Sequence, residues 1–106
     1  MDNKLALSPE TILTAYSNGA FPMAESKNHR GMLWISPDIR GVIPLANFHI
    51  SKSLRRLILR NKYRVTVNKD FVSVINSCAS RSETWINTPI RDCYIELWRK
   101  GYCHSI

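Results

Sequence analysis

Six lysine and arginine side chains and no acidic one occur between His49 and Arg64. At about 100° per residue, four of them fall on one face of a helix, namely Lys52, Arg55, Arg56 and Arg60. The opposite face is apolar and is expected to dock on a core through Leu54, Leu57 and Ile58. Arginine offers a rigid fork of donors and lysine a mobile point charge, so this array suits phosphate groups.

The overall charge of the chain agrees with an anionic partner. The 106 residues carry a formal net charge of +7 and are 44% hydrophobic, which allows one small domain with a modest core. A basic face can also be merely solvated and confer solubility. Because no acid neutralises these cations locally, we favour a polyanion such as nucleic acid. No stretch of the sequence approaches the roughly 20 apolar residues that a membrane span needs.

The three cysteines of the chain, Cys78, Cys93 and Cys103, contain no C-x-x-C pair. Their odd number and wide spacing predict neither a disulfide framework nor a zinc site. Free thiols fit a reducing cytoplasm. Cys78 falls on the apolar stripe of a predicted helix and is expected to be a small buried hydrophobe.

Four helices are predicted from cap residues and apolar periodicity, and they must position the basic and cysteine side chains described above. The expected caps at the helix starts are Ser8, Ser51, Asn68 and Thr88, with proline following the first and the last. The first helix is expected to stop at Asn18-Gly19 and the last at Gly101. The inner face of the third helix is predicted to comprise Phe71, Val74, Ile75 and Cys78. That of the last helix is predicted to comprise Ile90, Tyr94, Leu97 and Trp98.

Strands are predicted where apolar residues alternate with polar ones or form short runs between turn residues. The expected strands are residues 32–36, 42–45, 63–67 and 102–106, with an extended apolar segment at 21–23. Asp38 and Arg40, in the turn after the first strand, are expected to form an ion pair. The helices need more sheet to cover than these strands offer, which predicts that the sequence is the front part of a longer protein.

Several segments of the chain carry a family resemblance. Residues 15–23 read AYSNGAFPM, residues 34–40 read WISPDIR and residues 48–54 read FHISKSL. Further segments are CA at 78–79, TWI at 84–86 and GYCHSI at 101–106. In this order they resemble the leucyl/phenylalanyl-tRNA–protein transferase family over nearly the whole chain. Each segment alone is weak evidence for the resemblance, whereas the whole set in this order is specific for the family.

The resemblance implies an α/β (α+β) fold with two parts. Residues 1–46 would form a small N-terminal domain, and residues 47–106 the first, incomplete portion of an acetyltransferase-like (GNAT) domain. The implied enzyme is a cytoplasmic aminoacyltransferase, a monomer if complete, with no membrane association. It would move leucine or phenylalanine from aminoacyl-tRNA to the N-terminal lysine or arginine of an acceptor protein. This addition marks the acceptor for degradation through the N-degron pathway, and the acyl transfer needs no metal or cofactor.

The resemblance also implies roles for particular residues. The basic face formed by Lys52, Arg55, Arg56 and Arg60 would hold the acceptor stem of the tRNA. Four side chains match family positions around the aminoacylated 3′ adenosine: Tyr16, Met23, Trp85 and Tyr94. Met23 stands where many members have tryptophan and would cover a ring face more weakly. Without the resemblance, Tyr16 and Tyr94 on apolar helix faces fit a core role better, and Trp85 is the stronger independent candidate.

No catalytic residue is nominated from these positions. His49 precedes a helix cap and His104 falls in a predicted buried strand, so structural hydrogen bonding explains both better than general-base catalysis. In the family, the carboxylate assigned to catalysis and most of the side-chain pocket follow the position of Ile106. Three interpretations stay open: a working transferase fragment, a tRNA-binding module without turnover, and an inactive remnant whose exposed edge invites aggregation.

Overall fold

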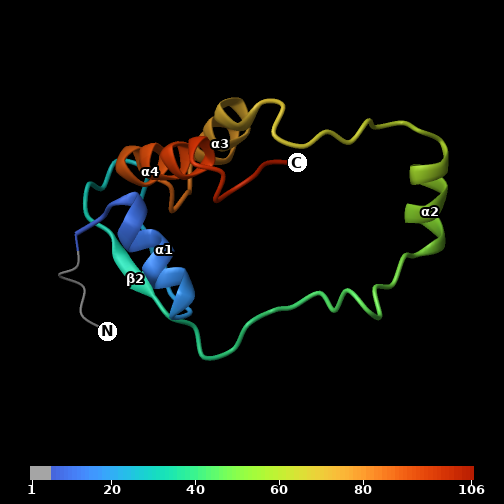
Figure 1. Ribbon diagram of the computed structural model, residues 1–106. Helices are drawn as coiled ribbons and strands as arrows, with labels where there is room; N and C mark the ends of the chain where they lie inside the picture. Colours follow the sequence, from blue (N-terminus) through green and yellow to red (C-terminus); the bar gives the residue numbers. More distant parts are fainter. Residues whose placement is uncertain (1–5) are drawn as a thin grey trace.

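The computed structural model describes residues 6–106, so the first five residues of the predicted N-terminal domain lie outside the described residues. The described part is a mixed α+β protein with four helices and two strands. In chain order these elements are α1 (Pro9–Ser17), β1 (Phe21–Met23), β2 (Leu33–Ile35), α2 (Lys52–Leu59), α3 (Phe71–Ala79) and α4 (Thr88–Arg99) (Figure 1).

Helix α1 begins and ends where its sequence signals predict. The Ser8 hydroxyl accepts a hydrogen bond from the Thr11 amide at 3.1 Å, and the Thr11 hydroxyl accepts one from the Ser8 amide at 2.8 Å. This reciprocal pair satisfies two amides that lack partners inside the helix. The helix ends at Ser17 with Asn18 as its C-cap, and Gly19 follows with a φ of +79°, a conformation that glycine adopts without strain.

The two strands form one small antiparallel sheet. Pro22 of β1 faces Trp34 of β2, and the extended apolar segment predicted at 21–23 is therefore the partner of the strand predicted at 32–36. Both side chains are buried. Trp34 joins the core that α1 and α4 cover, together with Ile12 and Leu97.

Helix α4 organises the larger core because its inner face contacts both α1 and α3. Ile90 and Leu97 are fully or almost fully buried, as their spacing predicts. Trp98, which is half-buried, stacks on Phe71 of α3 with ring centroids 5.2 Å apart and ring planes 3° from parallel. The predicted stop at Gly101 is confirmed by a φ of +84°.

The predicted cap of α3 is wrong. Asn68 does not cap this helix, because it has a φ of +57° and its amide side chain contacts the C-terminal segment instead. Asp70 occupies the cap position without a side-chain hydrogen bond. The start of α3 is therefore left without the side-chain acceptor that the sequence predicts for it.

The predicted cap of α4 is wrong by one residue. Helix α4 is capped by Asn87, whose side-chain carbonyl oxygen accepts from the Ile90 amide at 3.0 Å, so Thr88 is the first helical residue. Asn87 is buried, and its side-chain amide also donates to the His29 carbonyl at 2.8 Å. This one side chain thus starts the helix and fixes the loop before β2.

Three predicted strands are not strands. Residues 42–45, 63–67 and 102–106 pair with no strand in the described part of the chain. Alternation reports which side chains can share a face, whereas a strand also needs a partner backbone for its N–H and C=O groups. Instead of strand pairing between residues 63–67 and 102–106, one backbone hydrogen bond of 2.8 Å joins Asn68, just after the first segment, to Ser105 in the second.

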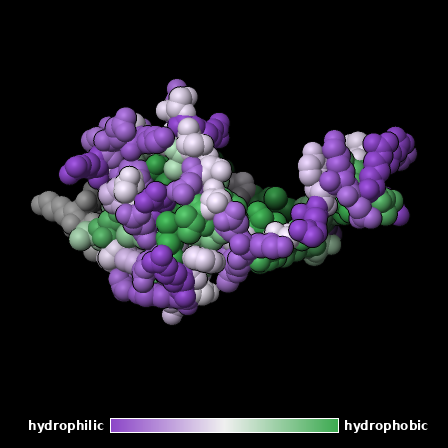
Figure 2. Space-filling model, turned by 90° about the horizontal axis from the view of Figure 1, so that it is seen from above, coloured by the Kyte–Doolittle hydropathy of each residue, from purple (hydrophilic) through white to green (hydrophobic). Residues whose placement is uncertain are grey.

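We call residues 39–67 the outer segment and the rest of the described chain the compact part. The outer segment leaves the compact part after β2, carries α2 at its far point and returns at α3 (Figure 1). No residue of α2 is buried, so the predicted docking of Leu54, Leu57 and Ile58 on a core is wrong. Figure 2 shows hydrophobic surface between the compact part and the lobe that contains α2.

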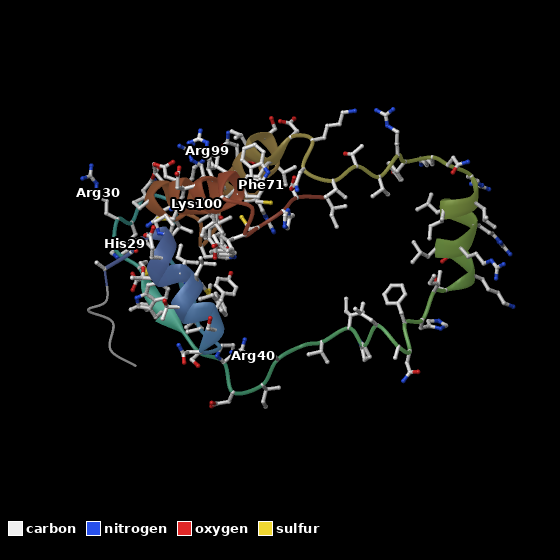
Figure 3. All side chains as sticks on the ribbon, viewed as in Figure 1. His29, Arg30, Arg40, Phe71, Arg99 and Lys100 are labelled. Carbon is white, nitrogen blue, oxygen red and sulfur yellow. The ribbon has the colours of Figure 1, made fainter. Side chains whose placement is uncertain are left out.

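The predicted ion pair between Asp38 and Arg40 is also wrong. The Arg40 guanidinium donates to the Gly19 carbonyl and ties the start of the outer segment to the end of α1 (Figure 3). The ion pairs within residues 6–106 lie elsewhere and are exposed: Arg91–Asp92, Arg99–Glu96 and Lys100–Glu10. Within the same residues, no helix has the length and apolarity needed to cross a bilayer.

Candidate functional site: an aromatic cavity and a separate basic helix

A cavity of about 660 Å³ opens in the compact part. Three of its lining side chains are aromatic rings that the sequence singled out: Tyr16 from α1, Trp85 from the loop before α4, and Tyr94 from α4. Its wall is mostly apolar, with Phe71, Val74, Ile75, Cys78 and Ile86 among the lining residues. Rings beside an apolar wall suit a flat or apolar ligand group.

Tyr16 and Tyr94 are joined by a hydrogen bond of 2.8 Å between their hydroxyl oxygens. Tyr94 is half-buried, whereas Tyr16 is 53% exposed. Burial, reinforced by the hydrogen bond to Tyr16, raises the pKa of Tyr94 above its ordinary value of 10.0. Tyr94 therefore stays neutral at physiological pH, and its ring contributes both to the core and to the cavity.

Trp85 is held at the backbone, and its indole ring is left accessible. Its carbonyl accepts a hydrogen bond of 2.9 Å from the Ala24 amide, which follows β1. The next residue, Ile86, is buried, and its amide donates to the Thr84 hydroxyl at 3.2 Å. Trp85 itself remains 37% exposed. A fixed backbone with an exposed ring is the arrangement that stacking on a ligand requires.

Met23 does not line the aromatic cavity. It lines a second cavity of about 430 Å³ together with Ala24, Glu83 and Thr84. Trp85 lines both cavities and so connects Met23 to the two tyrosines. The structure thus brings three of the four predicted adenosine-site residues to one cavity and places the fourth at its neighbour.

The prediction that the whole apolar face of α3 is buried in the core is only partly right. Phe71 and Ile75 are buried, as predicted, but Val74 is 38% exposed and Cys78 is exposed. Both line the cavity, so the predicted burial of Cys78 is wrong. The apolar stripe is wider than the contact with α4 needs, and its uncovered edge forms the cavity wall.

His104 also lines the cavity, and the prediction that it lies in a buried strand is wrong. It is exposed, in a segment without strand pairing, and its Nδ1 lies 2.7 Å from the side-chain nitrogen of Asn68. The neighbouring Cys103 donates from its thiol to the Tyr94 carbonyl at 3.3 Å. Burial raises the pKa of both Cys103 and Cys93, so both thiols are protonated at neutral pH. Within residues 6–106, no cluster of histidine, cysteine and acidic side chains is arranged to hold a metal ion.

Helix α2 presents its cations to solvent, well away from the cavity. The Ser51 hydroxyl caps it by accepting from the Leu54 amide at 3.2 Å, as predicted. All four predicted phosphate-binding side chains are exposed: Lys52, Arg55, Arg56 and Arg60. Figure 3 shows nitrogen-tipped side chains of α2 pointing away from the compact part. His49, just before the cap, is exposed as well.

The fold and these two features define a mixed α+β protein with a ring-lined apolar cavity and a detached cationic helix. The family model described as leucyl/phenylalanyl-tRNA protein transferase matches residues 42–106. The model of that family's N-terminal domain matches residues 6–38. The chain belongs to the leucyl/phenylalanyl-tRNA–protein transferase family, as the resemblance predicts.

Curated relatives agree with this assignment. The leucyl/phenylalanyl-tRNA–protein transferase of Ruegeria sp. (strain TM1040) is 46% identical over 102 residues, which are 96% of this chain and 49% of the relative. That of Cereibacter sphaeroides (strain KD131) is 50% identical over 101 residues, 95% of this chain and 47% of the relative. That of Rhodopseudomonas palustris (strain TIE-1) is 45% identical over 104 residues, 94% and 46% respectively. The chain therefore spans about half the length of the curated relatives it matches.

Proposed function

We propose that this chain binds the aminoacylated 3′ end of a tRNA carrying leucine or phenylalanine. In this proposal the chain takes part in transferring that amino acid to the N-terminal lysine or arginine of an acceptor protein, as a step that marks the acceptor for degradation. The observation that carries the proposal is the meeting of Tyr16, Trp85 and Tyr94 at one apolar cavity in a chain of the transferase family.

The cavity supports the proposal through the chemistry of its wall. The 3′ terminus of a tRNA is single-stranded, and an unpaired adenine binds proteins by stacking on aromatic side chains. Trp85 offers an accessible indole ring, and the rings of Tyr16 and Tyr94 line the same cavity. Apolar side chains from α3 lie beside these rings, as an esterified leucine or phenylalanine would require.

Helix α2 supports the tRNA part of the proposal. Exposed arginine and lysine side chains that contact phosphates bind an RNA stem without reading its sequence. Such binding accepts several donor tRNAs that share an amino acid. We assign Lys52, Arg55, Arg56 and Arg60 to the acceptor stem, with the terminus of the same molecule in the aromatic cavity.

The reaction itself is an acyl transfer. The neutral α-amine of the acceptor attacks the ester carbonyl, a C–N bond forms, and the C–O bond to the ribose breaks. The amine loses a proton and the leaving ribose oxygen gains one. The ester is already activated, so holding the two reactants together supplies a large part of the rate. The role proposed for this chain is to hold the ester end, and we assign no catalytic acid or base to it.

Four finer parts of the proposal concern organisation and location. We propose that residues 1–46 and 47–106 belong to different domains and that the second has an acetyltransferase-like (GNAT) relationship. We also propose a monomer that acts in the cytoplasm. The separate matches of two family models, to residues 6–38 and 42–106, support a two-domain organisation.

A transfer assay tests the proposed function. The purified 106-residue chain is incubated with phenylalanyl-tRNA bearing radiolabelled phenylalanine and with a peptide beginning with lysine. Label in that peptide, and not in a matched peptide beginning with glycine, would show that the chain performs the transfer by itself. The same mixture without the chain measures uncatalysed transfer to the peptide. Absence of both transfer and tRNA binding would refute the proposal.

A second candidate function is tRNA binding without turnover. The specific observation in its favour is that the chain spans about half the length of its curated relatives. It predicts salt-dependent binding of phenylalanyl-tRNA to the chain and no labelled peptide. Turnover by the purified chain would exclude this candidate.

A further inference from the structure

Asn68 clamps the C-terminal segment with both its backbone and its side chain. Its amide N–H donates to the Ser105 carbonyl at 2.8 Å, and its side-chain oxygen Oδ1 accepts from the Ser105 amide at 2.9 Å. Both backbone polar groups of Ser105, a buried residue, are thereby satisfied by one partner. The second bond also fixes which way the Asn68 amide group points, because only its oxygen can accept from an N–H.

This orientation determines the tautomer of a neutral His104 side chain. With Oδ1 on Ser105, the Asn68 nitrogen Nδ2 faces His104 Nδ1 at 2.7 Å. A side-chain amide nitrogen donates and does not accept, so Nδ1 of the imidazole must accept through its lone pair. A neutral imidazole carries one proton, which is therefore on Nε2. Asn68 thus makes His104 a hydrogen-bond donor at its free nitrogen.

His104 stands at the cavity already described. His104 is exposed and lines the cavity together with Tyr16, Trp85 and Tyr94, whereas Asn68 is not among the lining residues. The wall that these residues share is mostly apolar, and its other polar lining residues include Arg81, Glu83 and Thr84. The N–H donor of His104 adds a neutral group to this lining that can bind an acceptor oxygen of a ligand.

We propose that His104 is a ligand-binding residue that donates its Nε2–H to a ribose or carbonyl oxygen of the aminoacylated 3′ adenosine, and that Asn68 is the positioning residue that holds this tautomer. The proposal rests on the proposed function and adds a residue to it. It also assigns His104 a role other than general base, because its Nε2 bears a proton and its Nδ1 lone pair is occupied by Asn68.

Two substitutions of the exposed His104 distinguish the loss of the hydrogen-bond donor from the loss of the imidazole ring. In His104→Gln, the amide nitrogen can occupy the position of Nε2 and donate from there. In His104→Asn, the shorter side chain reaches only the position of Nδ1 and loses the donor. The probe is 3′-deoxyadenosine carrying phenylalanine through a 3′-amide, which keeps the carbonyl but does not hydrolyse. We expect the His104→Asn chain to bind it about three- to tenfold more weakly in calorimetry, and His104→Gln to restore most of that affinity.

Asn68 has its own test. Because Asn68 has a φ of +57°, Asn68→Gly keeps the backbone unstrained while removing the side chain. Long-range ¹H–¹⁵N NMR spectra report which imidazole nitrogen carries the proton. We expect the unsubstituted chain to show the Nε2–H form of His104 and Asn68→Gly to show a mixture of both forms. A merely structural role for Asn68 would leave the tautomer unchanged, and an Nδ1–H form in the unsubstituted chain would overturn the proposal.

The outcomes distinguish this proposal from the proposed function. If the unsubstituted chain does not bind the probe, the proposed function and this proposal both fail. If it binds the probe and His104→Asn binds equally well, only the role of His104 fails. Adenosine serves as a second probe: a loss with both probes places the acceptor on the ribose, and a loss with the amide alone places it at the carbonyl.

Discussion

At the scale of single residues, one hydrogen bond joins α1 to α4 at the edge of the aromatic cavity. Tyr16 and Tyr94 are 78 positions apart in the sequence, and their hydroxyl groups meet at 2.8 Å at the edge of the aromatic cavity. Trp85 joins them in the same cavity without being buried. The function of each ring depends on how much of it the core leaves uncovered.

Replacing Trp85 tests whether an exposed ring of the cavity binds the base. Trp85→Ala should weaken adenosine binding by about 1–3 kcal/mol, because one stacking surface is removed. Isothermal calorimetry with adenosine measures the change. The control is Tyr102→Ala, which removes an aromatic ring that is 62% exposed and lies outside the cavity. Equal effects in the two variants would exclude a specific base site at Trp85.

The raised pKa of Tyr94 predicts how stability changes in alkali. Burial raises the pKa of Tyr94 in the folded chain, so the unfolded chain loses this proton first, near its ordinary value of 10.0. The contribution of Tyr94 to stability is therefore complete below pH 10 and declines as the pH rises further. Tyr94→Phe should lower the free energy of unfolding by about 0.5–1.5 kcal/mol at pH 7 and show a smaller decline above pH 10.

The matched control for this prediction is Tyr16→Phe. It removes the same hydrogen bond of 2.8 Å but keeps the Tyr94 hydroxyl. It should therefore retain the alkaline decline that Tyr94→Phe loses. Urea unfolding followed by circular dichroism between pH 7 and 11 measures both variants. Parallel pH profiles for the two would show that Tyr94 is not the group responsible.

At the scale of elements, α1 and α2 contrast in what they contact. Both begin with a serine cap, and both have the apolar spacing of a helix. Helix α1 buries Ile12 and Ala15 against the core, whereas α2 buries nothing. The same local signals therefore give one helix that supports the fold and one that is supported only by its own hydrogen bonds and cap.

This contrast predicts different effects of removing the two caps. Ser8→Ala should lower the free energy of unfolding of the compact part by about 1 kcal/mol, because α1 belongs to the cooperative core. Ser51→Ala should leave that free energy unchanged and only reduce helix content. Urea titrations followed by tryptophan fluorescence report the core, which contains Trp34, and far-ultraviolet circular dichroism reports helix content. A loss of core stability in Ser51→Ala would show that α2 docks on the compact part.

The exposed cations of α2 lead to a prediction about the affinity and salt dependence of tRNA binding. Neutralising the basic face to glutamine, at Lys52, Arg55, Arg56 and Arg60, should weaken tRNA binding and lower its dependence on salt. The slope of the logarithm of the binding constant against the logarithm of salt concentration should fall by about one for each phosphate that the variant no longer neutralises. Filter binding from 50 to 300 mM salt measures the slope.

The control for the basic face neutralises three exposed cations of the compact part: Lys27, Arg30 and Arg99. Arg30 lies on the far side of the compact part from α2, and Arg99 lies at the upper edge of the compact part (Figure 3). Removing these three charges should change the slope less, for each charge removed, than removing the four charges of α2 does. The same slope change per charge in both variants would mean that tRNA responds to net charge alone and that α2 is not a specific binding element.

At the scale of the whole molecule, the compact part and the outer segment differ in how they are stabilised. The compact part has a continuous core around α4, whereas the outer segment exposes large apolar side chains such as Ile39, Leu45 and Val65, which are 92%, 89% and 75% exposed. Where such side chains form a contiguous surface, they mark an interaction site or an aggregation hazard. The outer segment carries the proposed RNA-binding cations at its far point.

Hydrogen exchange tests this division. Amides of α1 and α4 should exchange slowly, because they open only when the core unfolds, and amides of α2 should exchange almost as fast as in an unstructured peptide. Exchange followed by mass spectrometry of peptides covering residues 9–17, 52–59 and 88–99 measures the difference. Strong protection of residues 52–59 would contradict the arrangement described for the outer segment.

Much of the local structure follows from the sequence because helices satisfy their backbone groups within themselves. The start of α1 at Ser8, the start of α2 at Ser51 and the stop at Gly101 were predictable from cap chemistry. The cap of α4 was misassigned by one residue, since asparagine and threonine adjoin and both can cap. Strands at 42–45 and 63–67 were predicted wrongly, because alternation does not supply the backbone partner that a strand needs.

The family, the four helices and the cationic face of α2 were predictable from the amino-acid sequence, since these depend on residue types at short spacing. Three further features emerged with the packing of the chain: Tyr16, Trp85 and Tyr94 share a cavity, Met23 lies beside that cavity, and α2 stands apart. This packing also produces the Asn68–His104 hydrogen bond, which joins residues 36 positions apart. The physical reason is that a side chain's neighbours across the chain depend on which surfaces pack, and packing is decided by the whole molecule.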